Sequence, residues 1–308
     1  MSFFSLIFVF ALEQWRPFPW RARLHAAVDR MAAFLEEHFN AGQAHHGVIA
    51  WCIAVLPVCL LVWAVASLLH RLHPLLAFLF NVAVLYATMG FRQGSHYFTD
   101  IHRALKEGEL DVARTILAQW RGHPCVSLTR EEIVRLTIEQ ALIGAHRYVF
   151  AVMFWFTILP GPVGAVLYRL SDLLAERWNR VPAPGHESFG LPAQSIFRAL
   201  DAIPARLTAA GFAIVGDFED AVFCWRAQST LWADRVAGIV LASGAGAMGV
   251  RLGMPLHRDD GEFEDRPELG IGDEADVDYL DSTIGLLWRA LILWLALILI
   301  VTIVQALA

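Results

Sequence analysis

VIAWCIAVLPVCLLVWAVASLL, residues Val48–Leu69, is the stretch that decides the fold class, because its 22 residues carry no charge. An α-helix rises about 1.5 Å per residue, so this stretch is long enough to cross the roughly 30 Å hydrocarbon core of a bilayer. The sequence therefore predicts a transmembrane helix over 48–69.

Three other uncharged runs extend this prediction along the chain. They are 74–91, 148–168 and 290–308, with 18, 21 and 19 residues. Pro160-Gly161-Pro162 interrupts the 148–168 run, so we expect a kink or a re-entrant turn there. An apolar segment at 2–12 is short for a crossing and predicts an uncleaved N-terminal helix. We expect an all-α, polytopic integral membrane protein, with four or five transmembrane helices and helical polar segments in one domain over 1–308.

The composition supports a membrane protein. Hydrophobic residues make up 57% of the 308 residues, charged residues make up 18%, and the mean hydropathy is +0.50. Soluble domains are nearer 45–50% apolar and about 25% charged. Two more apolar stretches, 207–216 and 236–250, are short for crossings. We expect them to pack against other helices or to dip into the bilayer.

The charge pattern excludes several functions. The net charge is −6, and the window 259–281 holds 11 acidic residues and one basic residue. No overall nucleic-acid footprint is present, and Lys106 is the only lysine, which excludes a P-loop. The four cysteines include no C-x-x-C pair, so neither a disulfide framework nor a zinc site is expected. The acidic window matches no calcium loop and predicts a solvated loop before the last helix.

The sequence predicts helices in the polar segment between Arg92 and Arg147. Thr129 followed by Glu132 matches a capping box, in which the two side chains satisfy free backbone N–H groups. A helix is predicted from there to Leu159, beginning in water and ending in lipid. Glu131, Arg135 and Glu139 are spaced four apart, which predicts a ladder of surface ion pairs.

Several ordered blocks of this sequence resemble the CobD/CbiB family of cobalamin biosynthesis and its relative AmpE. The blocks are GPVGAVLYR (161–169), FG (189–190), LDAIPARL (200–207), AGAMGVRLG (245–253) and RPELG (266–270), together with ALKEGELDVA (104–113). The resemblance extends from about Arg92 to the C-terminal helix. It implies a multi-pass bacterial inner-membrane protein. The family's enzymes join aminopropanol, or its phosphate, to a carboxyl of cobyric acid through an amide bond.

The sequence departs from the family pattern at acidic positions. Glu139 matches the leading Glu of the family's E-N-T-x-D-G run, but IGAHRY (143–148) replaces the run itself. Asp172 stands where the family has Asn, and Ala175 where it has Asp. Phe197-Arg198 replaces a pair of acidic residues. Arg147 with Phe154-Trp155, and Leu200-Asp201 before Pro204, are similar to AmpE, which is associated with β-lactamase induction and cell-wall sensing.

Two functions therefore stay open, an enzyme of corrinoid amide formation and a non-catalytic membrane signalling or accessory protein like AmpE. Arginine forks suit the phosphate or carboxylate groups of a ligand, and carboxylates suit Mg²⁺. The candidate ligand-binding residues are Glu139, Arg147, Arg169, Asp172, Asp201 and Arg206. No metal site and no catalytic residue is assigned. ATP and Mg²⁺ are expected if the family reaction is retained, and the expected partners are the lipid bilayer and a corrinoid intermediate.

Overall fold

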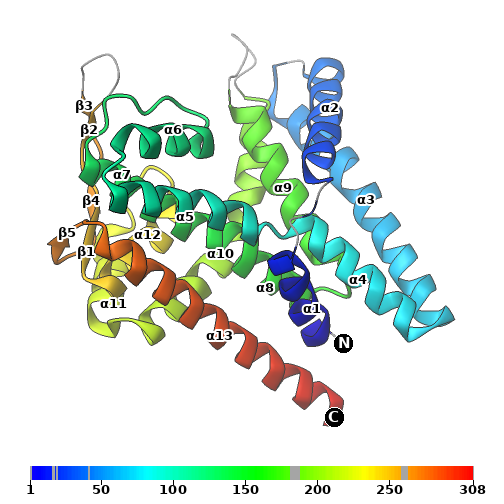
Figure 1. The fold of residues 1–308 in the computed structure, drawn as a ribbon. Helices are drawn as coiled ribbons and strands as arrows, with labels where there is room; N and C mark the ends of the chain where they lie inside the picture. Colours follow the sequence, from blue (N-terminus) through cyan, green and yellow to red (C-terminus); the bar gives the residue numbers. More distant parts are fainter. Residues whose placement is uncertain are drawn as a thin grey trace. The chain divides into compact units, whose positions relative to one another are not determined.

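The computed structural model describes residues 2–15, 18, 20–40, 42–180, 188–257 and 263–307. Contacts between Cα atoms divide the chain into two units. Unit 1 comprises residues 1–90, 151–203 and 301–308, and unit 2 comprises residues 91–150 and 204–300. Each unit is described by itself (Figure 1).

Unit 1 is built from apolar helices. They are α1 (Ser2–Trp15), α2 (Arg21–Phe39), α3 (Ala44–Leu72), α4 (Pro74–Thr88), α8 (Ala151–Ile158), α9 (Val163–Asn179) and the first part of α10 (Leu191–Val215). Helices α2, α3 and α4 pack against α9, and α1 packs against α4. The core where α2, α3 and α9 meet includes Ala54, Leu174 and Trp178. Trp178 donates its indole N–H to the carbonyl of Ala32 at 3.1 Å, so its one polar atom is satisfied in that core.

Unit 2 combines helices with a small β region. Its helices are α5 (Phe91–Glu107), α6 (Leu110–Arg121), α7 (Arg130–Ala145), the π-helical turn η1 (His146–Phe150), the rest of α10, α11 (Phe218–Gln228), α12 (Arg235–Met248) and α13 (Asp278–Leu307) as far as residue 300. Helix α12 is almost wholly buried. A Cβ on Gly246 of α12 would lie 2.5 Å from the backbone carbonyl oxygen of Asp220 on α11, so glycine permits this close helix packing.

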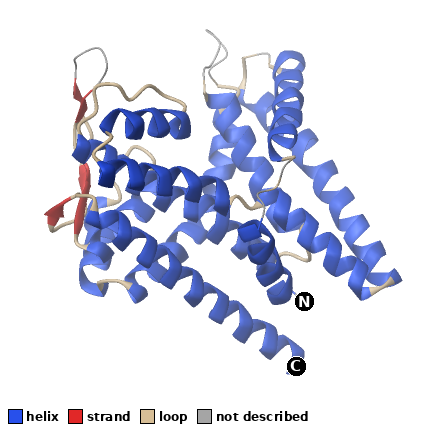
Figure 2. Cartoon of the chain, in the orientation of Figure 1, coloured by secondary structure: helices blue, strands red, loops and turns tan. Residues whose placement is uncertain are grey.

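The short strands of unit 2 follow α12 directly. Strand β1 (Val250–Gly253) pairs antiparallel with β4 (Glu268–Leu269) and parallel with β5 (Asp273–Glu274), while β2 (Leu256–His257) pairs antiparallel with β3 (Phe263–Glu264). Figure 2 shows these strands as the one part of the described chain that is neither helix nor loop. The sequence predicts a solvated loop over 259–281. The strands and the start of α13 correct that expectation, and 259–262 lie outside the described residues.

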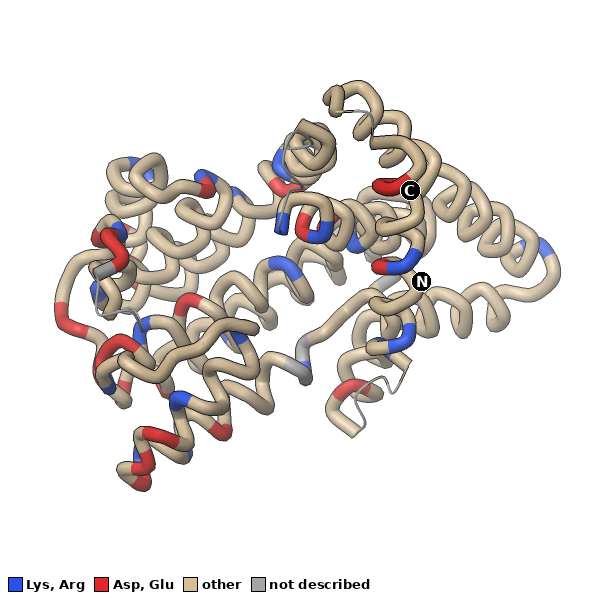
Figure 3. Tube along the Cα trace, turned by 90° about the horizontal axis from the view of Figure 1, so that it is seen from above, with Lys and Arg blue, Asp and Glu red and all other residues tan. Residues whose placement is uncertain are grey.

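The all-α membrane class is confirmed. Among the described residues, three helices are long and apolar enough to cross a membrane, over 44–72, 130–158 and 278–304. Helices α1 and α4 are apolar but shorter. Lys, Arg, Asp and Glu are absent from α4 and from α3 before its last turn, and the tube in Figure 3 has long tan stretches without such residues.

Three of the predicted apolar runs lie within single helices, and two are interrupted. Helix α3 contains 48–69, α13 contains 290–307, and α1 contains 2–12. The 74–91 run ends as a helix at Thr88, and Phe91 begins α5. The 148–168 run is divided, because the helix stops at Ile158 and α9 starts at Val163. Pro160 and Pro162 lack a backbone N–H and Gly161 has φ +65°, so the expected interruption is a complete break.

Candidate functional site

One face of α7 carries the charges that organise unit 2. Glu132, Arg135 and Glu139 are separated by three and four residues, which places them on one side of the helix. All three are buried. The predicted surface ladder of Glu131, Arg135 and Glu139 is therefore wrong. Only Glu131 is exposed, and the other two side chains bind the last residue of β1 and residues that follow it.

Glu139 joins two sequence blocks that are far apart in the chain. One carboxylate oxygen accepts the backbone N–H of Gly253 at 2.9 Å, and the other forms an ion pair with Arg266. Arg266 also lies over the ring of Trp232, with its guanidinium carbon 4.8 Å from the ring centre. Glu139 thus holds AGAMGVRLG (245–253) and RPELG (266–270) against α7.

Gly253 is required at this contact for two reasons. Its φ is +70°, in the left-handed region that side chains disfavour, and an added Cβ would lie 2.0 Å from the carbonyl oxygen of Pro267. Arg135 fixes the same turn by donating to the carbonyls of Gly253 at 3.0 Å and Pro255 at 3.4 Å. The backbone of this segment is therefore bound from both its N–H and its C=O sides.

Glu132 fixes the next strand and caps α7 at the same time. It accepts the backbone N–H of Thr129 at 2.7 Å, and the hydroxyl of Thr129 accepts the backbone N–H of Glu132 at 3.3 Å, so the predicted capping box is confirmed. Its other oxygen lies 2.8 Å from the backbone nitrogen of His257 and 2.9 Å from the Nδ1 atom of its ring. Glu132 is buried, whereas the His257 side chain is 45% exposed.

The π-helical turn η1 follows α7 and presents Arg147, another predicted residue. Its guanidinium lies 3.5 Å from the Asp234 carboxylate. Asp234 also accepts the N–H of Val236, where α12 begins. The neighbouring His146 ring is buried, with Nδ1 3.0 Å from the hydroxyl of Thr208 on α10. Such π-helical turns occur frequently at functional sites, and this one directs two side chains toward α10 and α12.

Unit 1 contains three of the predicted residues in two buried pairs. Arg169 binds Asp172, three residues later on α9, at 2.7 Å. The hydroxyl of Tyr168 donates to Asp201 of α10 at 2.8 Å. Arg206, on the same helix as Asp201, is exposed. Since the six predicted residues are divided between the two units, their convergence on one ligand stays a prediction.

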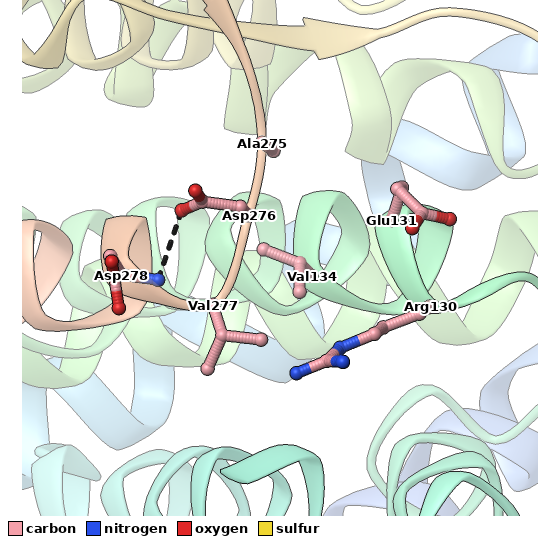
Figure 4. A pocket seen from close by; sticks show the side chains of 7 residues that line it. All are labelled: Arg130, Glu131, Val134, Ala275, Asp276, Val277 and Asp278. Atoms are coloured by element: carbon pink, nitrogen blue, oxygen red, sulfur yellow. Dashed lines mark hydrogen bonds between the residues drawn. The ribbon is translucent and has the colours of Figure 1, made fainter. Parts of the chain in front are cut away.

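A surface pocket of about 340 Å³ lies on the other side of α7. Residues Arg130, Glu131, Val134, Ala275, Asp276, Val277 and Asp278 line it. Figure 4 shows Asp276 accepting a bond from Asp278, and this bond, to the backbone N–H, is 3.0 Å long. None of the six predicted residues lines this pocket. The acidic window supplies part of its wall, and that window was the one sequence signal for it.

Two histidines outside the spanning helices have displaced pKa values. Burial lowers the pKa of His102 on α5, and the nearby carboxylate of Asp281 opposes that shift. Lys106 binds the same carboxylate at 3.1 Å. In unit 1, burial lowers the pKa of His25, and the positive charge of Arg169 lowers it further.

The residues that the structure describes contain no group of three or more His, Cys, Asp or Glu side chains placed to hold a metal ion. The acidic candidates are instead engaged with protein groups. Glu139 is paired with Arg266 and Asp172 with Arg169, and Asp201 accepts a bond from Tyr168. Because these carboxylates do not fit a Mg²⁺ site as they stand, we derive no step through a metal.

The helices and the buried charged face of α7 define an all-α membrane protein in which side chains anchor an irregular segment. Comparison with known proteins places it more closely. The family model described as CobD/Cbib protein matches residues 6–306, and the chain belongs to the CobD/CbiB family. The predicted resemblance to that family is thereby confirmed, while the AmpE-like features stay a prediction.

The relatives match along most of their length. Cobalamin biosynthesis protein CobD of Stutzerimonas stutzeri (strain A1501) is 36% identical over 302 residues, which is 96% of this chain and 97% of the relative. A CobD protein of Chromobacterium violaceum is 34% identical, covering 92% and 89% of the two chains. Cobalamin biosynthesis protein CbiB of Salmonella typhimurium is 27% identical, covering 93% and 91%. No solved structure matches the chain.

Proposed function

We propose that this chain acts in cobalamin biosynthesis in the bacterial inner membrane, as a multi-pass protein. In this proposal it joins aminopropanol, or its phosphate, to a carboxyl of cobyric acid through an amide bond. The supporting observation is the match to relatives named for cobalamin biosynthesis, which covers 96% of this chain at 36% identity. Fold alone does not define a reaction. The proposal therefore also requires side chains that can bind the substrates of amide formation.

Amide formation requires an activated carboxyl, a neutral amine and stabilisation of the negative charge that develops on the carbonyl oxygen. A nucleoside triphosphate such as ATP would activate the carboxyl as an acyl phosphate. Arginine is suited to bind the phosphate or carboxylate groups of such ligands. We assign this binding role to Arg147 and Arg206, which both belong to unit 2, whereas Arg169 is buried and paired with Asp172. The carboxylates Glu139, Asp172 and Asp201 then hold the local structure in place.

A deletion strain tests the proposal. In an organism that encodes no other member of the family, the strain is expected to stop making cobalamin from supplied cobyric acid, and a plasmid copy of the gene restores synthesis. Purified protein in detergent should convert cobyric acid, ATP and aminopropanol phosphate to the amide, measured by mass spectrometry. Unchanged cobalamin synthesis in the deletion strain contradicts the proposal.

The same strain tests the AmpE-like alternative. A changed response to β-lactams together with unchanged cobalamin synthesis would favour a signalling or accessory role. Fractionation tests the membrane location independently, since protein that stays in the aqueous phase without detergent contradicts it.

A further inference from the structure

We infer that the outer side of α2 contacts anionic phospholipid, with an apolar stripe against the acyl chains and two arginines against the phosphates. Helix α2 belongs to unit 1 and lies between the apolar helices α1 and α3 in the chain. It is not one of the three helices that are long and apolar enough to cross a membrane. The contact therefore adds a lipid-binding surface to the spanning helices, and it does not depend on the proposed reaction.

One side of α2 packs inside unit 1. Ala32 and Leu35 are buried in the core that α2 shares with α3 and α9. Arg21, at the start of the helix, is also buried and pairs with Glu13 of α1. These contacts fix which side of α2 faces inward and which side faces outward.

The outward side carries a second apolar stripe. Trp20, directly before α2, and Leu24 and Phe34 within it are 58%, 43% and 57% exposed. Exposed Ala27 and half-buried Met31 complete the spacing of three or four residues that aligns side chains along a helix. A surface helix in water buries one apolar side and presents polar residues elsewhere. A second, exposed apolar stripe therefore requires an apolar partner.

Two arginines follow one edge of this stripe. Arg23 and Arg30 are both exposed, and their separation of about two turns places them in one row. The guanidinium carbon of Arg23 lies 4.9 Å from the centre of the Trp20 ring. Arg30 donates from Nε to the carbonyl of Ala26 at 3.2 Å. That bond uses neither of its terminal nitrogens, which are the atoms that form a forked contact with phosphate.

The acidic residues of α2 lie away from this arginine row. At 3.6 residues per turn, Asp29 is on the opposite side of the helix from the apolar stripe. Glu36 and Glu37 are in the last turn, and Glu36 lies 3.6 Å from Arg177 of α9. The arginines are therefore the charges beside the first turns of the stripe. An apolar stripe flanked by aromatic and basic side chains is typical of helices at a membrane interface, where arginine reaches the phosphates while its stem stays on apolar surface.

The neighbouring helices continue the same apolar surface. Phe8 of α1 and Ile49 and Ile53 of α3 are exposed. Helix α3 packs against α2 and is one of the helices long and apolar enough to span the membrane. Trp15, which ends α1, is also exposed, and tryptophan is enriched at the level of the headgroups. Because α2 packs beside a lipid-facing helix, phospholipid is the partner that meets its outer stripe.

Labelling of single cysteines tests the stripe in the full chain, in lipid nanodiscs that contain phosphatidylglycerol. Leu24→Cys and Phe34→Cys are expected to react with a water-soluble maleimide at least about tenfold more slowly than Ala26→Cys, because a thiol in apolar surroundings stays protonated. Ala26 is the matched control, since it is exposed on the other side of the same helix. Labelling of the parent protein, with its 4 native cysteines, is subtracted. Equal rates at the three positions overturn the inference.

Lipid retention tests the arginines. Protein purified in mild detergent is expected to keep phosphatidylglycerol in preference to phosphatidylcholine, measured by native mass spectrometry. The double variant Arg23→Gln with Arg30→Gln should bind phosphatidylglycerol about tenfold more weakly, because each basic residue adds to the attraction of an anionic lipid surface. Arg103→Gln with Arg226→Gln is the control, since both arginines are exposed in unit 2. Equal retention by the Arg23 and Arg30 variant and the parent overturns the arginine contact.

A second copy of the chain is the competing partner for the stripe. Phe34→Cys protein in vesicles is expected to stay monomeric after mild oxidation, measured by electrophoresis without reductant. A disulfide-linked dimer that forms through residue 34, and is absent from Ala26→Cys protein, overturns the lipid contact in favour of a protein interface. None of these measurements uses amide formation, so their failure leaves the proposed function standing.

Discussion

The two units bury charged residues in different ways. In unit 1, Arg169 and Asp172 are three residues apart on one helix. In unit 2, Glu139 binds Gly253 and Arg266, which lie 114 and 127 residues further along the chain. A helix satisfies its own backbone, whereas strands of two to four residues leave N–H and C=O groups without ladder partners. Buried side chains of α7 supply those partners in unit 2. Unit 1 has a long-range contact of another kind, because buried Arg21 pairs with Glu13 and donates to the carbonyl of Met89, at the end of a helix and not of a strand.

Gly253→Ala should have the largest effect on the long-range contacts of unit 2. The left-handed φ alone costs about 1–3 kcal/mol for a residue with a side chain, and the added Cβ would overlap the Pro267 carbonyl. We expect the free energy of unfolding to fall by more than about 3 kcal/mol, or folded protein to be lost, measured by thermal unfolding in detergent. Gly285→Ala on α13 is the control, because nothing lies within 4 Å of its Cβ position. Equal midpoints for the two variants would contradict this account of β1.

Glu139→Gln tests the ion pair itself. It leaves Arg266 buried without a negative partner, and breaking a buried pair in this way costs about 3–5 kcal/mol. The measurement is again the free energy of unfolding. The double variant Glu139→Gln with Arg266→Gln should be less destabilised than the sum of the two single variants. Additive effects would mean that the pair is not coupled.

Tyr168→Phe provides the corresponding test in unit 1. It removes the hydroxyl that donates to Asp201 and leaves a buried carboxylate with one bond fewer. A loss of about 1.5–3 kcal/mol is expected, the range for hydrogen bonds to charged groups. A loss greater than that of Glu139→Gln would reverse the comparison between the units.

The part of the fold that could be predicted from sequence is the part set by local pattern. The uncharged run at 48–69 and the Thr129–Glu132 capping box each follow from neighbouring residues, and both were predicted correctly. The burial of the charged face of α7 was not predicted. Helical spacing shows that its charged residues lie on one side of the helix, but it does not show whether other parts of the chain cover them. The bonds from Glu139 and Glu132 to residues more than 100 positions away have no local signature.

The smallest predicted effect compares the units by their response to acid. His102 in unit 2 and His25 in unit 1 both have a pKa lowered from 6.5 in the folded protein. Below pH 6.5 the unfolded chain therefore takes up protons before the folded chain does, and stability falls until the pH drops below the folded pKa. His102→Gln and His25→Gln should each flatten this loss between pH 7.5 and pH 5.5, measured by unfolding midpoints in detergent. His96→Gln is the control, because His96 is exposed on the same helix as His102. A substitution that leaves the loss unchanged would contradict the prediction for the unit that holds that histidine, and would show that the other unit is the more sensitive to acid.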